Sequence, residues 1–271
     1  MKGYISSAGG QIHYRRLGDG TPLILLHQVP SSSWMWDKLL EPLARRGYAA
    51  VAFDLPGYGM SDPPDHPPDL PYYALRIADA AAALGFDRYG VVGHHTGGSV
   101  AIQLAIDHPG RVTGLVVYGL ALIDEEFAQR LATEQPPDYD ADGAVVTKFW
   151  KARWGDHSGE LAAFIAARAT AEMLTSMKHR PEGHVAIGRA DHVAMVRALQ
   201  RPILAVAGRR EMLYMESQRG PTISPLVDFK ELGNAGIDVV DEMPDQFAEV
   251  IHQFFSRYAR VDGVTQTDRN S

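Results

Sequence analysis

The chain has 271 residues, enough for one large domain or two small ones with a buried core. Its 45% hydrophobic and 22% charged residues exclude a disordered chain, a collagen-like repeat and a coiled coil. A formal net charge of −7 without a basic run argues against nucleic acid or an anionic membrane as a partner. Cysteine is absent, which excludes disulfides and a cysteine nucleophile and favours a reducing, cytoplasmic location.

Short apolar runs alternate with amphipathic stretches along the chain. The runs are almost continuously apolar, as in strands covered on both faces, at residues 22–26, 48–53, 89–92, 115–118 and 202–207. Helical patterns lie between or after them, at residues 34–46, 72–84, 99–107 and 245–258. Residues 10–17 predict one arm of an antiparallel edge hairpin. The alternation predicts an α/β fold, a mostly parallel central sheet with helices on both faces.

One long stretch breaks this alternation. Residues 124–198 have helical patterns without a convincing strand, so we expect a helical cap inserted over one end of the sheet. The core is then formed by residues 1–123 and 199–260. The polar residues 261–271 predict a flexible tail.

The strongest local motif follows the run at 89–92. Here the sequence Gly93-His-His-Thr-Gly97 lies between a predicted strand and a predicted helix. This is the pattern of a nucleophile elbow, G-x-Nu-x-G, whose glycines permit a sharp turn and close packing of helix on strand. The central residue, His95, is therefore expected at the carboxyl edge of the sheet, where ligands bind in such folds.

With this elbow, the chain resembles the α/β-hydrolase family over nearly its whole length. Further matches occur in the expected order, at His27, Asp54-Leu-Pro-Gly-Tyr-Gly-Met-Ser61, Asp107-His-Pro-Gly-Arg-Val112, Pro202-Ile-Leu-Ala-Val-Ala-Gly208 and Pro244-x-x-Phe247. The resemblance implies the α/β-hydrolase fold with a cap, and a catalytic triad at three positions of this sequence.

The departures from the family pattern fall on those three positions. His95 stands where the family usually has serine, and Ile237 stands where it has its catalytic histidine. Glu211 occupies the position of the family's acid, as an acceptable variant. Since Ile237 can neither take a proton nor give one, the ordinary serine-esterase mechanism is not expected.

An imidazole at the elbow can act without activation, because its ordinary pKa is near ~6.5. His95 is therefore expected to serve as a general base, or alternatively as a nucleophile through an acyl-imidazole. Glu211 either orients His95 or is an ordinary surface carboxylate. The resemblance also implies an oxyanion site formed by the backbone N–H groups of Val29 and Thr96.

Other residues near the predicted pocket have both structural and functional interpretations. We expect His27 to brace the oxyanion loop and His94 to support the elbow, whereas Gln28 either donates to substrate or fixes its loop. In the cap, aromatic residues either line a pocket for an apolar substrate or pack the cap itself, namely Tyr139, Phe149, Trp150 and Trp154. Among the cap histidines His179, His184 and His192, the pair Asp191-His192 is the best candidate to replace the lost catalytic histidine. No spacing resembles a metal-ligand motif.

These observations predict a cofactor-free enzyme that acts on a small, partly apolar molecule, by hydrolysis or by non-hydrolytic proton transfer. The alternative is a catalytically silent relative that binds a small molecule, and a structural partner in a larger assembly is a third possibility. Dehalogenases and epoxide hydrolases of this family use an elbow aspartate to form an alkyl ester, which His95 cannot do. The sequence leaves the oligomeric state open.

Overall fold

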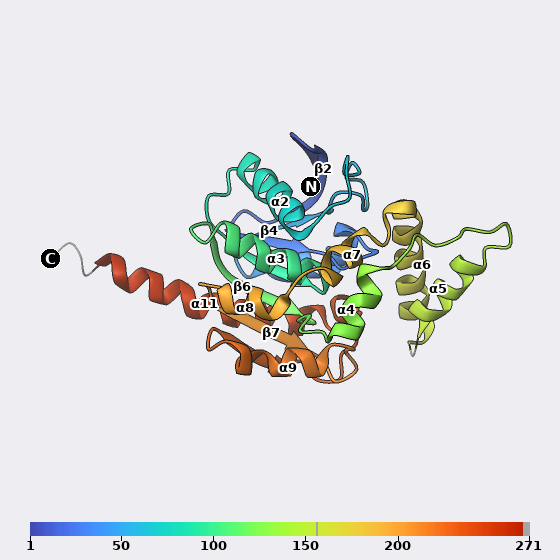
Figure 1. Ribbon diagram of the computed structural model, residues 1–271. Coiled ribbons are helices and arrows are strands. Elements are labelled where there is room, and N and C mark those ends of the chain that lie inside the picture. Colours follow the sequence, from blue (N-terminus) through green and yellow to red (C-terminus); the bar gives the residue numbers. More distant parts are fainter. Residues whose placement is uncertain (156, 268–271) are drawn as a thin grey trace.

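The computed structural model describes residues 1–155 and 157–267, and its centre is an eight-stranded sheet (Figure 1). The strands are β1 (Lys2–Ser7), β2 (Gly10–Leu17), β3 (Thr21–Leu26), β4 (Tyr48–Phe53), β5 (Tyr89–His94), β6 (Val112–Tyr118), β7 (Ile203–Ala207) and β8 (Val227–Glu231). Their spatial order is β1-β2-β4-β3-β5-β6-β7-β8. The pairs β1/β2 and β2/β4 are antiparallel and all other pairs are parallel, which confirms the predicted fold class.

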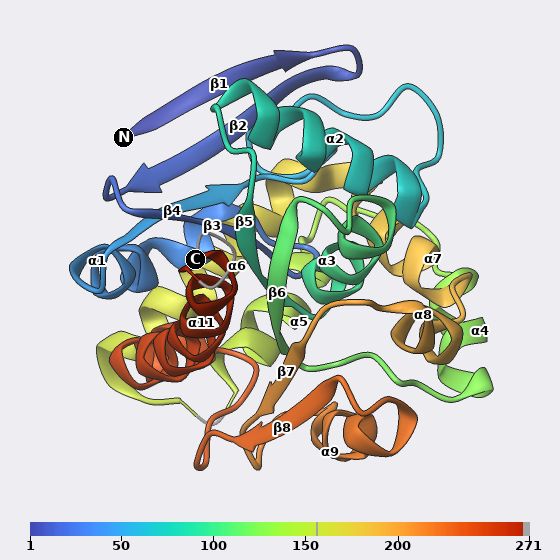
Figure 2. The same cartoon turned by 90° about the vertical axis from the view of Figure 1, so that its left-hand side faces the viewer.

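Helices cover both faces of the sheet (Figure 2). One face packs against α1 (Asp37–Arg45), which follows the short η1 (Ser33–Trp36), and against α10 (Val239–Glu242) and α11 (Pro244–Thr267). The other face packs against α2 (Leu70–Ala83), α3 (Thr96–Asp107), α8 (His192–Ala198) and α9 (Tyr214–Ile223). Because both faces are covered, the strands β3 to β7 are buried almost throughout, which explains their unbroken apolar sequences.

The inserted segment is helical, as predicted. It contains α4 (Glu125–Ala132), α5 (Ala144–Trp154), α6 (Gly159–Ser176), η2 (Met177–His179) and α7 (Glu182–Gly188), and its described residues include no strand. The next helix, α8, packs against α3 and therefore lies with the core, although its residues fall within the range predicted for the cap. Within the described ranges, no helix is long and apolar enough to span a membrane.

Three elements differ from the prediction. The last helix, α11, continues to Thr267, so residues 261–267 are helical where a flexible tail was expected, and residues 268–271 lie outside the described residues. Polar composition alone does not stop a helix, and this stretch contains no proline. Strand β1 is the other arm of the predicted edge hairpin, whose position the sequence did not specify, and strand β8 was not predicted; both lie at the sheet edges and are only partly buried.

Glycines of the elbow allow α3 to approach the sheet closely. A Cβ atom at Gly97 would overlap the carbonyl group of Leu26 in β3, and one at Gly93 would overlap the carbonyl group of Gly97. A Cβ at Gly98 would lie 2.5 Å from Val117 in β6. The glycines predicted from the elbow motif are therefore required by packing between helix and strand.

We expect Gly97→Ala to lower the free energy of unfolding by about 2–4 kcal/mol, since the rigid backbone of Leu26 leaves the new methyl group no room. Urea denaturation followed by circular dichroism measures this. Gly110→Ala is the matched control, because nothing lies within 4 Å of its Cβ position, and it should change stability by less than about 0.5 kcal/mol. Equal stability of the two variants would contradict the packing argument.

Candidate active site

His95 lies at the tip of the elbow between β5 and α3, at the carboxyl edge of the sheet. Its backbone has φ 47° and ψ −109°, a conformation that a residue with a side chain rarely adopts and that costs about 1–3 kcal/mol. The backbone N–H of His95 donates to the carbonyl oxygen of Tyr118 at 2.9 Å, which fixes the turn against β6. The elbow therefore holds the imidazole at the position where the fold places its reactive side chain.

Glu211 forms a direct contact with His95. Imidazole Nε2 lies 2.8 Å from Oε1 of Glu211, although 116 positions separate the two residues in sequence. The carboxylate follows β7, where the turn begins at Gly208, and its Oε1 also accepts the backbone N–H of Leu213 at 3.1 Å. The Glu211 side chain is fully buried and that of His95 is 13% exposed, so the pair is shielded from water on the acid's side.

Electrostatics define the protonation of Glu211. Burial raises the pKa of Glu211, but the charge and hydrogen bond of His95 outweigh burial and lower that pKa to about 2. The carboxylate is thus ionised at neutral pH and accepts only, so Nε2 of His95 carries the shared hydrogen. The other ring nitrogen, Nδ1, is then the one left for substrate or water.

Gly119 provides the space that the imidazole occupies. This residue follows β6 with φ 72°, and a Cβ atom there would overlap the His95 ring and lie 2.5 Å from Nε2. Any larger residue at position 119 would push the ring away from Glu211. The elbow and the residue after β6 therefore together determine the orientation of the His95 imidazole.

His94 lies in the core beneath the elbow. It is fully buried, and its Nε2 donates to the carbonyl oxygen of Ile237 at 2.9 Å. Burial holds the pKa of His94 well below its usual value, so the ring is neutral. Its ring lies between those of His95 and Tyr118, with centroids 4.7 and 5.0 Å away, and Tyr118 in turn donates to the carbonyl of Gly236. These contacts hold the segment that contains Ile237.

Backbone donors remain available beside His95. Val29 and Thr96 both line the cavity, and we find no acceptor for their backbone N–H groups among the residues described. The loop that contains Val29 is braced by His27, whose Nδ1 donates to the Gln28 carbonyl at 2.8 Å while Nε2 accepts the Leu55 N–H at 2.9 Å. The His27 ring thus links the backbone of this loop to the backbone of Leu55. Gln28 itself lines the cavity.

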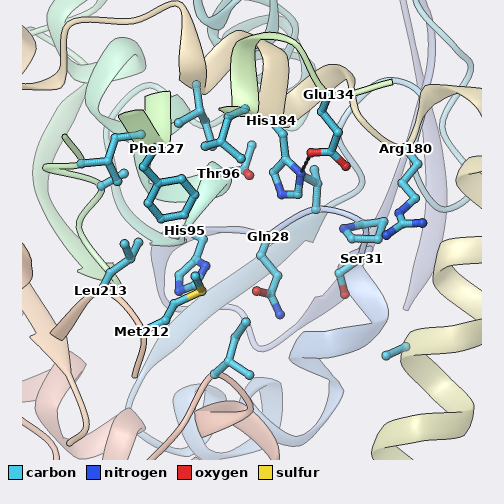
Figure 3. A pocket seen from close by; sticks show the side chains of 18 of the residues that line it. Gln28, Ser31, His95, Thr96, Phe127, Glu134, Arg180, His184, Met212 and Leu213 are labelled. Carbon is cyan, nitrogen blue, oxygen red and sulfur yellow. Dashed lines mark hydrogen bonds and ion pairs between the residues drawn. The ribbon is translucent and has the colours of Figure 1, made fainter. Parts of the chain in front are cut away.

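A cavity of about 330 Å³ opens above the elbow, between the sheet edge and the cap (Figure 3). Its apolar walls come from Ala121, Ile123, Phe127, Leu131, Phe149, Ala169, Ile187, Leu213 and Ile237. Its polar lining comes from Gln28, Ser31, His95, Thr96, Arg130, Glu134, Arg153, Arg168, Arg180 and His184. A cavity of this size and mixed lining suits a small, partly apolar molecule.

Several residues predicted for this pocket lie elsewhere. Trp150 and Trp154 are each 37% exposed and lie beside each other on α5, with ring centroids 6.2 Å apart. Neither they nor Tyr139 are among the residues that line the cavity, whereas Phe149 is. His192 is buried against the core, where its Nε2 lies 2.8 Å from Oγ of Ser99, and burial lowers its pKa to about 4. The reason is that α8 packs on α3 and not above the elbow.

The cap instead contributes polar residues that sequence reasoning did not single out. His184 of α7 lines the cavity and forms a 2.7 Å contact through Nδ1 with Oε2 of Glu134, 50 positions earlier (Figure 3). The guanidinium groups of Arg130 and Arg180 lie over the rings of Phe127 and Phe149, at 4.3 and 5.4 Å from the centroids. His184 was considered among the cap histidines, but no local signal separated it from the others.

Buried ion pairs join the cap to the core at the cavity wall. Arg168 of α6 binds Glu172 at 2.7 Å and Asp241 of α10 at 2.5 Å. Ser31 and Ser32, next to the oxyanion loop, donate to the same Glu172 carboxylate at 2.9 and 2.6 Å. Arg153 of α5 similarly binds Asp238, close to Ile237. These contacts fix the positions of α5 and α6 relative to the oxyanion loop and to the segment after Gly236.

Comparison with known proteins agrees with this architecture. Residues 21–154 match the family described as the alpha/beta hydrolase fold. A fluoroacetate dehalogenase of Burkholderia sp is 28% identical over 93% of this chain and 92% of its own length. A soluble epoxide hydrolase of Corynebacterium sp. is 37% identical, but over only 40% of this chain and 38% of its own length. The solved structure of an enol-lactonase from Burkholderia xenovorans LB400 superposes with a TM-score of 0.76 at 19% identity, covering 94% of this chain and 100% of that one.

The chain therefore has the α/β-hydrolase fold, as its elbow and loop motifs indicated, and residues 21–154 match the family of that name. The similar proteins differ in the reactions that their names describe, so the likeness defines the fold and not the reaction.

The Glu211 contact has a measurable effect on acid stability. Because its pKa is depressed in the folded state, Glu211 stabilises the fold above its unfolded value of about 4.3, and this stabilisation is lost as the pH falls toward about 2. We expect Glu211→Gln to be less stable than the wild type at pH 7 and the difference to shrink between pH 5 and 3. Urea denaturation at several pH values tests this, with exposed Glu126→Gln as the control. A difference that does not change with pH would contradict an ionised, paired Glu211.

Proposed function

We propose that this protein is a cofactor-free hydrolase of small, partly apolar esters or lactones, in which His95 is the general base. The contact of 2.8 Å between His95 and Glu211 carries the proposal, because it places a base held by an acid at the elbow of a hydrolase fold. The apolar walls of the cavity and the backbone donors of Val29 and Thr96 support it. The hydrolase names of the relatives support an enzyme, and the lactonase superposition adds only that the same fold accommodates a lactone.

The reaction follows from the groups that surround His95. Nδ1 of His95 takes a proton from a water molecule, and the resulting hydroxide attacks the carbonyl carbon of the substrate. The oxygen of that carbonyl becomes an anion, which accepts hydrogen bonds from the N–H groups of Val29 and Thr96. Collapse of the tetrahedral intermediate breaks the bond to the leaving alkoxide, which takes one proton from water or from an acidic side chain of the cavity, and His95 returns its own proton to solvent. Glu211 stays ionised throughout and stabilises the imidazolium.

Nucleophilic attack by Nδ1 through an acyl-imidazole is the second path open to the same atom. In both paths the imidazole is indispensable, whereas in a silent binding protein it is not. Ile237 favours the silent alternative, because its side chain lines the cavity where the family has its catalytic histidine.

We expect His95→Gln to lower kcat/KM for p-nitrophenyl butyrate by about 10²–10⁴-fold, the usual contribution of a positioned general base. Glutamine keeps a polar side chain of similar length but cannot take the proton. Release of p-nitrophenolate measures the rate.

The control for this experiment is His66→Gln, since His66 is an exposed histidine far from the elbow in the sequence, and this variant should keep the wild-type rate. Turnover by His95→Gln at the wild-type rate would exclude His95 as base and as nucleophile. A wild-type chain that binds esters or lactones in calorimetry without hydrolysing them would establish the silent alternative.

A further inference from the structure

We propose that His184, held by Glu134, is a second catalytic residue and donates a proton to the leaving group opposite His95. This inference rests on the proposed function and extends it to the step that His95 does not perform. It stands on three observations, which are the position of α7 above the oxyanion donors, the orientation of the imidazole, and the cavity that His184 and His95 both line.

The start of α7 is seated directly on the residues that supply the oxyanion donors. A Cβ at Gly183 would lie 2.9 Å from Val29 Cγ1 and 3.1 Å from Thr96 Cγ2, so a side chain there would require these groups to shift. The N–H of Gly183 donates to the hydroxyl of the buried Tyr58 at 2.9 Å, which fastens the helix to the core. The next residue, His184, is therefore fixed immediately beside the place where a substrate carbonyl would bind.

A second close contact brings the partner of His184 into position. Helices α4 and α7 cross so closely that a Cβ at Gly188 would overlap the backbone of Ala128 and Ala132. The chain leaving α4 then reaches Glu134, whose Oε2 lies 2.7 Å from Nδ1 of His184. Two glycines of one short helix thus determine where His184 lies and which acid it meets.

The hydrogen bond orients the imidazole for proton transfer. Burial raises the pKa of Glu134, but its bond to His184 outweighs burial and lowers that pKa, so the carboxylate is ionised and accepts the hydrogen of Nδ1. The side chains of His184 and Glu134 are 27% and 30% exposed, so both remain in contact with the cavity or its mouth. Nε2 is left as the nitrogen that can face a ligand, and Figure 3 shows Glu134 bonded at the other ring nitrogen of His184.

The two imidazoles divide the proton transfers of hydrolysis between them. His95 Nδ1 receives one proton from water, and protonated His184 releases one from Nε2 to the leaving oxygen as the carbon–oxygen bond breaks. The ester and water become an acid and an alcohol. His95 then loses its proton to solvent and His184 regains one, so both imidazoles return to their starting states. A single serine-type histidine would perform both transfers in turn, whereas here two residues share them.

The test compares two esters with the same acyl group and different leaving groups. p-Nitrophenolate is a weak base and leaves without a proton, whereas ethoxide is a strong base and needs one. For ethyl butyrate, His184→Gln should lower kcat/KM by about 10²–10⁴-fold, but for p-nitrophenyl butyrate by less than about tenfold. His95→Gln should impair both esters alike, since water must be deprotonated in either case. Acid release in a pH-stat measures both reactions.

The matched control is His179→Gln. His179 lies in the same cap segment and also contacts a glutamate, Glu182, through Nδ1 at 2.9 Å, but it is not among the residues that line the cavity. This variant should hydrolyse both esters at the wild-type rate. Because His184→Gln could disturb α7, a second pair of variants leaves the imidazole intact. Glu134→Ala should reproduce the selective loss on ethyl butyrate, and Glu134→Gln should lose less, because its amide oxygen still accepts the bond.

The outcomes separate this inference from the proposed function. If His95→Gln impairs both esters while His184→Gln impairs neither, or both equally, the acid role of His184 is wrong and the hydrolase proposal stands. If the wild type hydrolyses neither ester, or His95→Gln keeps the wild-type rate, the hydrolase proposal fails and the role of His184 fails with it. A loss confined to ethyl butyrate in both His184→Gln and Glu134→Ala supports the inference.

Discussion

The contact between His95 and Glu211 is the interaction on which the site depends. A carboxylate buried this completely needs a hydrogen-bonding partner, since an unpaired buried charge is strongly destabilising. The imidazole depends on the carboxylate in turn, because the bond at Nε2 selects its tautomer and leaves Nδ1 for a ligand or water. To place the imidazole beside Glu211, His95 adopts an unfavourable backbone conformation. The tight packing of α3 on the sheet maintains this conformation.

The cap completes the site because it is anchored at the same edge of the sheet. Arg168, Glu172 and Asp241 form a buried network that also engages Ser31, next to the oxyanion loop. Buried ion pairs contribute little net stability when their desolvation is counted, but their geometry is specific. We interpret the network as the device that fixes α6 relative to the core, and Gly183 of α7 provides a second fixed point against Val29.

The fold and the elbow could be predicted because their signals are local. Three patterns predict their structures without reference to distant residues. They are the glycines at 93 and 97, the continuously apolar strands, and the loop beginning at Asp54. Asp54 illustrates this, since its carboxylate accepts the N–H group of Met60 within its own turn. The edge strand β8 has no such signal, because its burial alternates over only five residues.

The cap could be predicted as helical but not in its orientation. Asp191-His192 looked like a catalytic pair, yet α8 packs on the core, and the pair that lines the cavity joins residues 50 positions apart. Which face of a cap helix meets the cavity is decided by tertiary crossings such as that of α4 and α7, which periodicity does not encode.

Gly119 links the choice of elbow residue to a different strand. The imidazole of His95 reaches Glu211 through the volume that a side chain at position 119 would fill. A histidine in place of serine at such an elbow therefore requires a residue without a side chain 24 positions later. Substitutions at positions 95 and 119 are expected to depend on each other. In protein engineering, transfer of this elbow to another protein of the same fold would require both His95 and Gly119 to be introduced.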